Sequence, residues 1–259
     1  MKIAISTVTR DHRDTKHRWK AFSSVLEEAK SMGVELVTLP GGFFVARSSA
    51  ERDALAKRIS SEAARRGIAV AVGIDVKQEQ QSVKGQGKKL TATDKKRHEK
   101  VIREQTLPSF VVCWSRQSRS HCWRQRSTSS KDQVCVPAQA CVRKQSILVN
   151  NRSVEVLACG EIFNERIRKA IIDRRPRVKA VVDLAHDGKG LRINPALRRF
   201  GECGITSLCS AHVSLKGAMK RGFNHRGMDI SSRDSDINIP RNSKMIPHAP
   251  RIEAKIYEV

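Results

Sequence analysis

The sequence has few aromatic residues, few acidic residues relative to basic ones, and no long apolar run. Aromatic residues make up 4% of the 259 residues, although a hydrophobic fraction of 39% is enough for a buried core. No segment approaches the roughly 18 consecutive apolar residues that a membrane-spanning helix needs. The first residues, MKIAISTVTR, lack the long apolar segment of a secretory signal peptide. We therefore expect a cytoplasmic protein without a membrane span.

Paired cysteines are also missing. The seven cysteines are an odd number and include no Cys-x-x-Cys pair; they stand at positions 113, 122, 135, 141, 159, 203 and 209. Scattered cysteines of this kind predict neither a disulfide framework nor a structural zinc site. Reduced thiols in the cytosol fit this pattern best.

Basic residues are in large excess. Lys and Arg number 50 against 26 Asp and Glu, which gives a formal net charge of +24. Such a charge favours adsorption to nucleic acid or anionic surfaces whatever the specific function. Many of these charges fall in the segment Lys84–Arg103, which is either a solvated insertion or a basic arm that contacts phosphates. Because no aromatic residue interrupts this segment, base stacking on it is not expected.

Short apolar segments alternate with amphipathic ones along most of the chain. Apolar and β-branched runs predict strands at 1–9, 34–39, 68–76, 110–113, 146–150, 153–158, 178–185, 205–213 and 251–259. Helical spacing and capping signals predict helices at 16–32, from a Ser48–Glu51 capping box to Gly67, at 162–171, and at 196–200 with Pro195 in its first turn. The alternation indicates an α/β layered fold. It resumes after a basic, polar insertion at about 77–107, so we predict one domain spanning 1–259.

The segment 154–171, VEVLACGEIFNERIRKAI, changes from a strand pattern to a helical pattern at Cys159. A thiol at the start of a helix lies near unpaired amides, which favour the thiolate. Gly160 lets the backbone approach closely, and amides at such a turn can bind an oxyanion. The alternative is that Cys159 is simply a buried residue at an ordinary turn. The local pattern therefore makes Cys159 a candidate nucleophile and Gly160 a candidate oxyanion residue.

Four segments, in this order, resemble segments of the nitrilase superfamily, the carbon–nitrogen hydrolases. They are KIAISTV at 2–8, VELVTLPGGFF at 34–44, VEVLACGEIFNE at 154–165 and VKAVVDLAHDG at 178–188. The resemblance covers most of the chain outside about 77–107 and implies a nitrilase-like α-β-β-α sandwich. It also implies cleavage of a small amide or nitrile through a cysteine thiolate and an acyl-enzyme, with no metal or organic cofactor. Association into homo-oligomers is a further expectation, since members of this family commonly associate.

The resemblance carries over unevenly to the catalytic positions. Cys159 matches the nucleophile, but Gly41 stands where the family has its general-base glutamate. The lysine that stabilises the tetrahedral intermediate is matched best by Gln125. Neither Gly nor Gln can replace the charge or proton transfer of these residues. The resemblance therefore predicts a hydrolase that is impaired, unless other residues supply these roles.

Several charged residues are candidates for the missing roles. Arg124, Arg126 or Lys131 could supply the positive charge, and Asp132 lies about where many members carry a second glutamate. Glu161 is a further candidate, because the family often has an acidic residue at that position. Glu165, by contrast, suits the structural role of complementing the dipole of the following helix.

Two alternatives remain open at this point. A Cys159–His186–Asp187 relay would also activate the thiol, although adjacent His and Asp side chains do not readily orient each other. His186 and His212 end or lie within apolar strands, where histidines are more often core residues. The second alternative is a non-catalytic nitrilase-fold protein that binds nucleic acid or other polyanions through its basic surface, including Lys84–Arg103.

Overall fold

The computed structural model describes residues 1–9, 15–77, 109–127, 142–186, 190–213, 245–247 and 252–259. The strands are β1 (Lys2–Thr9), β2 (Leu36–Ala46), β3 (Ala69–Val76), β4 (Ser109–Ser115), β5 (Arg119–Arg124), β6 (Ser146–Val149), β7 (Arg152–Ala158), β8 (Val178–Ala185), β9 (Thr206–Val213), β10 (Met245–Pro247) and β11 (Ile252–Glu258). The helices are α1 (Thr15–Ser31), α2 (Ser49–Arg66), the 3₁₀ turn η2 (Cys159–Phe163), α6 (Glu165–Ile172) and α7 (Gly190–Glu202). None of these helices is both long and apolar enough to cross a membrane.

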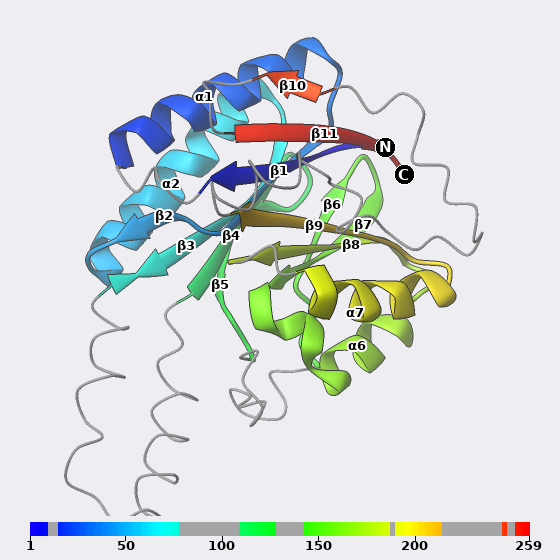
Figure 1. Ribbon diagram of the computed structural model, residues 1–259. Coiled ribbons are helices and arrows are strands. Elements are labelled where there is room, and N and C mark those ends of the chain that lie inside the picture. Colours follow the sequence, from blue (N-terminus) through cyan, green and yellow to red (C-terminus); the bar gives the residue numbers. More distant parts are fainter. Residues whose placement is uncertain (10–14, 78–108, 128–141, 187–189, 214–244, 248–251) are drawn as a thin grey trace, which may run out of the picture.

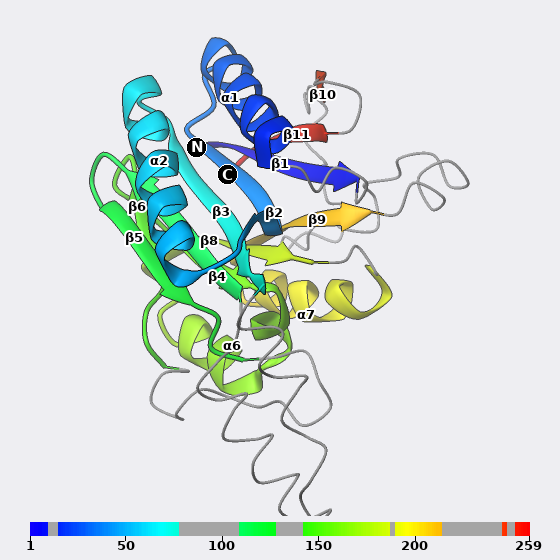
Figure 2. The same ribbon diagram turned by 90° about the vertical axis from the view of Figure 1, so that its left-hand side faces the viewer.

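The strands form one continuous mixed sheet in the order β5-β4-β3-β2-β1-β9-β8-β7-β6, with β11 antiparallel to β1 and β10 beside β11. The sheet folds on itself, so that the β2–β5 half faces the β6–β9 half (Figures 1 and 2). Helices α1 and α2 cover the outside of the first half, and α6 and α7 cover the second. The fold is therefore the α-β-β-α sandwich that the resemblance to the nitrilase superfamily implies.

Among the described residues, the layers enclose three apolar cores. The central core joins the two halves of the sheet, with Ile3, Leu36 and Val111 on one side and Val156 and Val182 on the other. Both faces of β3 are consequently buried, which explains its nearly continuous apolar sequence. Burial of these side chains, at about 25 cal/mol per Å² of apolar surface, is the main force that holds the layers together.

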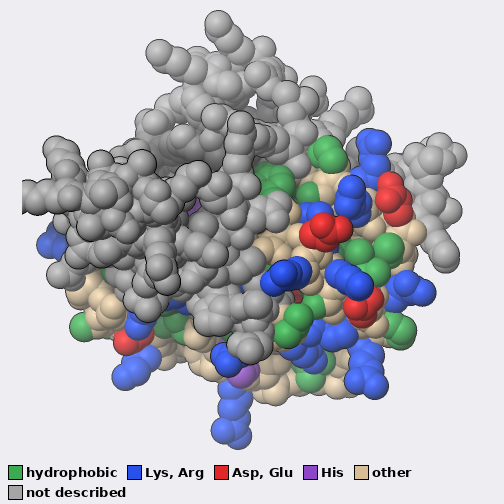
Figure 3. All heavy atoms as spheres, turned by 90° about the horizontal axis from the view of Figure 1, so that it is seen from below, with side chains coloured by type: hydrophobic (Ala, Val, Ile, Leu, Met, Phe, Trp, Pro, Cys, Tyr) green, Lys and Arg blue, Asp and Glu red, His purple; other side chains and the backbone are tan. Residues whose placement is uncertain are grey.

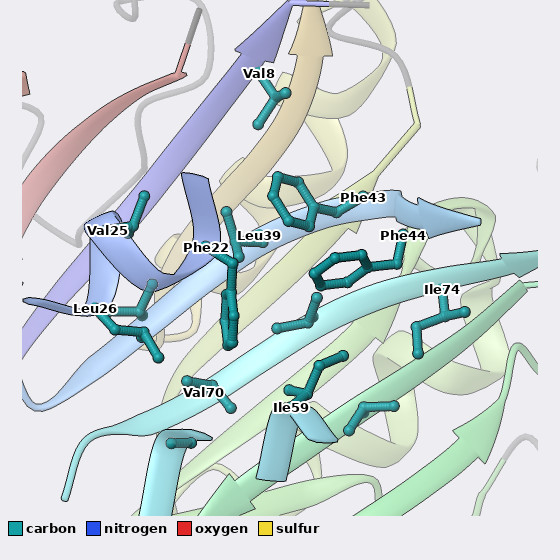
Figure 4. Close-up of a cluster of buried hydrophobic side chains, with 14 of the residues drawn as sticks. Val8, Phe22, Val25, Leu26, Leu39, Phe43, Phe44, Ile59, Val70 and Ile74 are labelled. Atoms are coloured by element: carbon teal, nitrogen blue, oxygen red, sulfur yellow. The ribbon is translucent and has the colours of Figure 1, made fainter. Parts of the chain in front are cut away.

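The core beneath α1 and α2 is built around aromatic side chains of α1 and β2 (Figure 4). Phe43 and Phe44 both belong to this core, although neighbouring residues of a regular strand point to opposite faces. The pairing of β2 with β3 shifts register between Leu39 and Phe44, and Gly42 has φ +64°, which lets both rings turn inward. The buried guanidinium of Arg18 donates to the carbonyl oxygens of Gly42 and Phe43 and so holds this irregular segment.

Most predicted elements are present, with bounds that differ by a few residues. Ser48 caps α2 by accepting a hydrogen bond from the Glu51 amide, and Gly67 ends the helix in the left-handed region. The Glu51 carboxylate accepts from the amide of Arg47 rather than from that of Ser48, so the box is shifted by one residue. Asn150 and Asn151 both have positive φ, as a tight hairpin turn between β6 and β7 requires.

Some local features differ from the sequence predictions. Strand β2 runs on through the Pro-Gly-Gly segment to Ala46, because β3 continues to pair with it beyond the irregularity. Helix α7 spans Gly190–Glu202 and has Pro195 in its interior rather than in its first turn. Strand β5 was not predicted, because its mostly exposed sequence, RSHCWR, lacks the apolar pattern of a buried strand. It forms because β4 offers it an antiparallel partner.

The topology brings distant segments to one edge of the sandwich. Strands β3, β2, β1, β9, β8 and β7 are parallel neighbours in this order, so their carboxyl ends lie on the same edge. Cys159 follows β7, His186 follows β8, and Asp75 is the penultimate residue of β3. Loops at the carboxyl ends of parallel strands commonly carry the reactive groups of α/β proteins.

Candidate active site

Cys159 lies directly after β7 and begins η2 with φ +46°. A positive φ is costly for a residue with a Cβ and is found where the surrounding structure fixes the backbone. The side chain is partly exposed, and the amide of His186 donates to its Sγ over 3.5 Å. The turn therefore presents the thiol at the edge of the sheet and places a backbone donor beside it.

The predicted helix does not begin at Cys159. The chain first makes the five-residue turn η2, and α6 begins only at Glu165, where the Asn164 side chain accepts from the amides of Arg166 and Ile167. Because the helix starts six residues later, the helix dipole expected beside the thiol is not part of this site. Glu165 lies exposed in the first turn of α6, in agreement with a structural role.

Glu161 forms a fully buried ion pair with Arg126. The guanidinium donates to both carboxylate oxygens, over 3.1 Å from Nε and 3.0 Å from Nη2. The same carboxylate accepts from the amide of Arg126 and from the amide of Ala158, the residue before the cysteine. Glu161 therefore ties the segment after β5 to the turn that carries Cys159.

His186 and Asp75 form a second pair at the site. His186 Nε2 lies 2.8 Å from Oδ1 and 3.0 Å from Oδ2 of Asp75, and the Ser109 hydroxyl donates to Asp75 Oδ1 over 2.8 Å. The imidazole is 31% exposed and the carboxylate 12% exposed, so the pair lies at the edge of the core. The two residues are 111 positions apart and meet because β3 and β8 end on the same edge.

The two glycines of β2 leave the space that this pair occupies. A Cβ added at Gly41 would lie 2.8 Å from ring atoms of His186 and 2.7 Å from the carbonyl oxygen of Leu184. A Cβ added at Gly42 would lie 2.6 Å from Asp75 Oδ2. Contacts this short are not tolerated without displacement. The imidazole thus borders the position from which the family's glutamate side chain would extend.

The protonation of His186 is strongly biased by its neighbours. Burial lowers the pKa of the imidazole, but hydrogen bonds and charge interactions with Asp75 and Cys159 raise it, and the net result lies well above the ordinary value. An opposite charge within hydrogen-bonding distance has this effect because it stabilises the imidazolium. The local electrostatics therefore favour a charged imidazole between the carboxylate and the thiol.

A buried carboxyl lies close enough to influence the thiol. Asp183 of β8 is fully buried, and burial, together with the negative charges of Cys159 and Glu161, raises its pKa well above the ordinary value. The Cys209 thiol donates to Asp183 Oδ2 over 4.0 Å, and burial also raises the pKa of that thiol well above its ordinary value. Burial therefore favours the neutral form of both groups, and Cys159 is the member of this cluster that reaches the surface.

The other residues named from the sequence lie as follows. Arg124 is partly exposed at the end of β5, with its guanidinium 5.0 Å from the centre of the Phe110 ring. Gln125 is buried and donates to the carbonyl oxygen of Ser127 over 2.6 Å. Lys131, Asp132, Asp187 and the segment Lys84–Arg103 lie outside the described residues.

Sequence reasoning missed Asp75. The signal was a single carboxylate in a strand whose other residues are apolar or glycine, since an ionised side chain is rarely buried without a partner. The partner could not be identified from the sequence, because it follows a strand of the other half of the sheet. Among the described residues, no group of three or more His, Cys, Asp or Glu side chains is arranged to hold a metal ion.

The fold is that of the nitrilase superfamily of carbon–nitrogen hydrolases. Solved structures of an amidase from Nesterenkonia sp. AN1 match it across 82% of this chain. A mutant with the acetamide moiety of fluoroacetamide added at its active-site cysteine matches with a TM-score of 0.57, 17% identity and 76% of its own chain. A mutant showing Michael addition of acrylamide at that cysteine matches with a TM-score of 0.58, 16% identity and coverage of 78% of its own chain. A further mutant, described as an amidase from the nitrilase superfamily, matches with a TM-score of 0.55, 16% identity and coverage of 76% of its own chain. No protein-family model and no curated protein matches the sequence.

Proposed function

We propose that the protein hydrolyses a carbon–nitrogen bond of a small amide or nitrile through a covalent intermediate on Cys159. The observation that carries this proposal is the partly exposed thiol held at positive φ after β7, with the His186 amide 3.5 Å from Sγ. The amidase with a similar fold carries its covalent adducts at a cysteine, which supports the same class of reaction here.

In the proposed reaction the Cys159 thiolate attacks the carbonyl carbon of the amide. The C–S bond forms as the carbonyl electron pair moves to oxygen, and the C–N bond then breaks to release ammonia or an amine. Water attacks the thioester, and the C–S bond breaks to give a carboxylic acid and the free enzyme. The amide of Gly160 and the guanidinium of Arg124 are the candidates for stabilising the developing oxyanion. Asp132 is a further candidate for proton transfer.

Glu161 is proposed to act through position rather than through proton transfer. Its carboxylate already accepts four hydrogen bonds, two from the Arg126 guanidinium and two from backbone amides. Because two donors already bind each carboxylate oxygen, the side chain is held in place and is not available to exchange a proton with a substrate. Its contribution is to fix Ala158, and thereby the backbone of Cys159, at the end of β7.

The proposal is tested by incubating the full chain with a panel of short aliphatic amides and nitriles and measuring released ammonia. We expect turnover by the wild type and none by Cys159→Ser, with an acyl adduct on Cys159 trapped in acid and located by mass spectrometry. Cys122→Ser, which removes an exposed bystander thiol of β5, should keep full activity. Equal ammonia release by the wild type and Cys159→Ser would refute the proposal.

A second candidate function is polyanion binding by the basic surface. Exposed basic side chains extend over α6 and the turn after it, at Arg166, Lys169, Arg175, Arg177 and Lys179. Basic side chains outnumber acidic ones on the face shown in Figure 3, although the two kinds are interspersed. Binding of this type would be insensitive to nucleic-acid sequence and would weaken steeply with salt. This candidate function would be favoured if the protein is retained on heparin, is released at moderate salt and shows no amide turnover. The basic residues of Lys84–Arg103 would add further charge to such a surface.

A further inference from the structure

The site contains a pair, His186 and Asp75, that the nitrilase resemblance does not assign. This family's base is a glutamate, and its position is Gly41 in this chain. The imidazole of His186 lies against Gly41, close enough that a single added methyl group would overlap the ring. The pair therefore occupies the space beside the thiol that a longer side chain on β2 would fill.

We propose that His186 is the general base and acid of this site and that Asp75 is its positioning residue, so that a Cys159–His186–Asp75 relay replaces the missing glutamate. This inference rests on the proposed function, because it assigns a base to the same reaction. It differs from the Cys159–His186–Asp187 relay considered from the sequence, since the carboxylate comes from β3 and not from the next residue. Asp75 can orient the ring because it approaches from another strand.

The hydrogen bonds of the His186 imidazole suggest a role for each ring nitrogen in proton transfer. Nε2 is 2.8 Å from Asp75 Oδ1, and the Asp75 carboxylate therefore fixes the tautomer and orientation of the ring. Proton exchange with Cys159 Sγ then uses Nδ1, which lies on the side of the ring nearer Gly41. Ser109 holds the carboxylate from β4, and the amide of His186 points at Sγ. The carboxylate and the thiol are thus each held by a second contact besides the proposed proton relay.

The proton balance of the reaction follows from this arrangement. Nδ1 takes the proton of the thiol, and the thiolate attacks the carbonyl carbon. The imidazolium then gives this proton to the departing nitrogen as the C–N bond breaks. Nδ1 next takes a proton from the attacking water, and returns it to sulfur when the C–S bond breaks. The net reaction consumes one amide and one water and needs no other co-reactant.

The charges around the imidazole support an ion pair with the thiolate. Asp75 faces the ring from β3 and Cys159 from η2, while Asp183 of β8 is near enough to interact with it by charge. Strand β4 contributes the Ser109 hydroxyl, and β2 contributes the two glycines. The two groups that raise the pKa of the imidazole, Asp75 and Cys159, are both acidic and favour the imidazolium. An imidazolium in turn favours the thiolate of Cys159.

The experiment is the pH dependence of Cys159 alkylation by iodoacetamide in the full chain, with each cysteine followed by peptide mass spectrometry. We expect the wild-type rate to rise at a pH well below the value of about 8.5 that governs a free thiol. His186→Gln should move this rise up toward the free-thiol value and lower the rate at about pH 6 by roughly tenfold, since loss of thiolate outweighs the gain in nucleophilicity. Asp75→Asn should shift the profile in the same direction by a smaller amount.

Matched controls separate the relay from general damage. His121→Gln and Asp53→Asn remove the same groups from the exposed surfaces of β5 and α2, and both should leave the profile unchanged. NMR of the His186 ring in the folded wild type provides a second measurement that does not depend on mutating the pair. Its titration should move to lower pH in Cys159→Ser, because the thiolate no longer stabilises the imidazolium. An unshifted alkylation profile in His186→Gln, or an unshifted titration in Cys159→Ser, would overturn the relay.

The relay and the proposed hydrolysis can fail separately. Alkylation that depends on His186, combined with no turnover of any amide or nitrile, would support the relay and count against the reaction. Turnover that survives in His186→Gln at the wild-type rate would support the reaction and overturn the relay. A loss of about 10²-fold or more in the turnover of His186→Gln, with its fold intact by circular dichroism, supports both.

Discussion

Replacing Glu161 by Gln should destabilise the protein strongly, because it leaves a buried positive charge without its counter-charge. The Arg126 side chain is only 3% exposed and that of Glu161 is 0% exposed. Removing one partner of such a pair typically costs about 3–5 kcal/mol of folding free energy. Since domains of this kind are stable by about 5–15 kcal/mol in total, this is a large share of the whole. The glutamine oxygen can still accept from the amide of Ala158, but the amide of Arg126, which bonds to the other oxygen, loses its acceptor.

The double variant Glu161→Gln/Arg126→Met tests that reasoning. It removes the unpaired charge and keeps an acceptor for one of the two backbone amides, so it should be more stable than Glu161→Gln alone. Replacement of both members of a buried pair is often close to neutral. Glu165→Gln, an exposed change in the first turn of α6, is the control and should cost less than about 1 kcal/mol.

The assay is urea unfolding followed by circular dichroism and by the fluorescence of the three tryptophans. The free energies of the wild type, Glu161→Gln, Arg126→Met and the double variant form a cycle that gives the coupling between the two residues. The reasoning is refuted if Glu161→Gln lies within about 1 kcal/mol of the wild type, or if the double variant is no more stable than that single variant. A stable Glu161→Gln variant without amide turnover would instead indicate a direct catalytic role for this carboxylate.

Three further predictions concern the glycine beside the site, the buried carboxyl and a helix cap. Gly41→Ala should destabilise the protein by about 1–3 kcal/mol through overpacking and should slow Cys159 alkylation, since the added methyl group meets the His186 ring. Gly33→Ala adds a methyl group that has nothing within 4 Å but strains a backbone at φ +68°, so it controls for lost stability without a contact at the site. Unchanged alkylation in Gly41→Ala would contradict the prediction. Burial first, and then neighbouring negative charge, raise the pKa of Asp183. The folded state therefore keeps a proton that the unfolded chain loses near about pH 4. Because of this difference, the free energy of unfolding falls as the pH rises above that value. Asp183→Asn should therefore flatten this part of a stability–pH curve and raise stability at neutral pH, and a curve parallel to that of the wild type would count against the assignment. Ser48→Ala should cost about 1 kcal/mol, because the amide that the hydroxyl caps at the start of α2 loses its acceptor, and an unchanged urea midpoint would show that the cap contributes nothing.

Much of the local structure follows from the sequence because its causes are local. The capping serine of α2, the left-handed glycine that ends it and the Asn-Asn turn of the β6–β7 hairpin each depend on a few adjacent residues. The change of period at Cys159 likewise marks the end of a strand. Strand β5 and the full length of β2 escaped prediction because pairing with β4 and β3, rather than their own pattern, makes them strands.

Some features of the candidate site could likewise be predicted from the sequence, and others could not. The sequence by itself determined that Cys159 ends a buried strand at a turn, and the nitrilase resemblance predicted that Gly41 stands at the family's base position. Only the tertiary structure decided that Asp75 meets His186 and that Arg126 neutralises Glu161, since the first pair is separated by 111 residues and the second by 35. The physical reason is that a charged side chain near the core is paired by whichever strand ends lie beside it. The order and direction of the strands in the folded sheet set those neighbours, and no local pattern contains them.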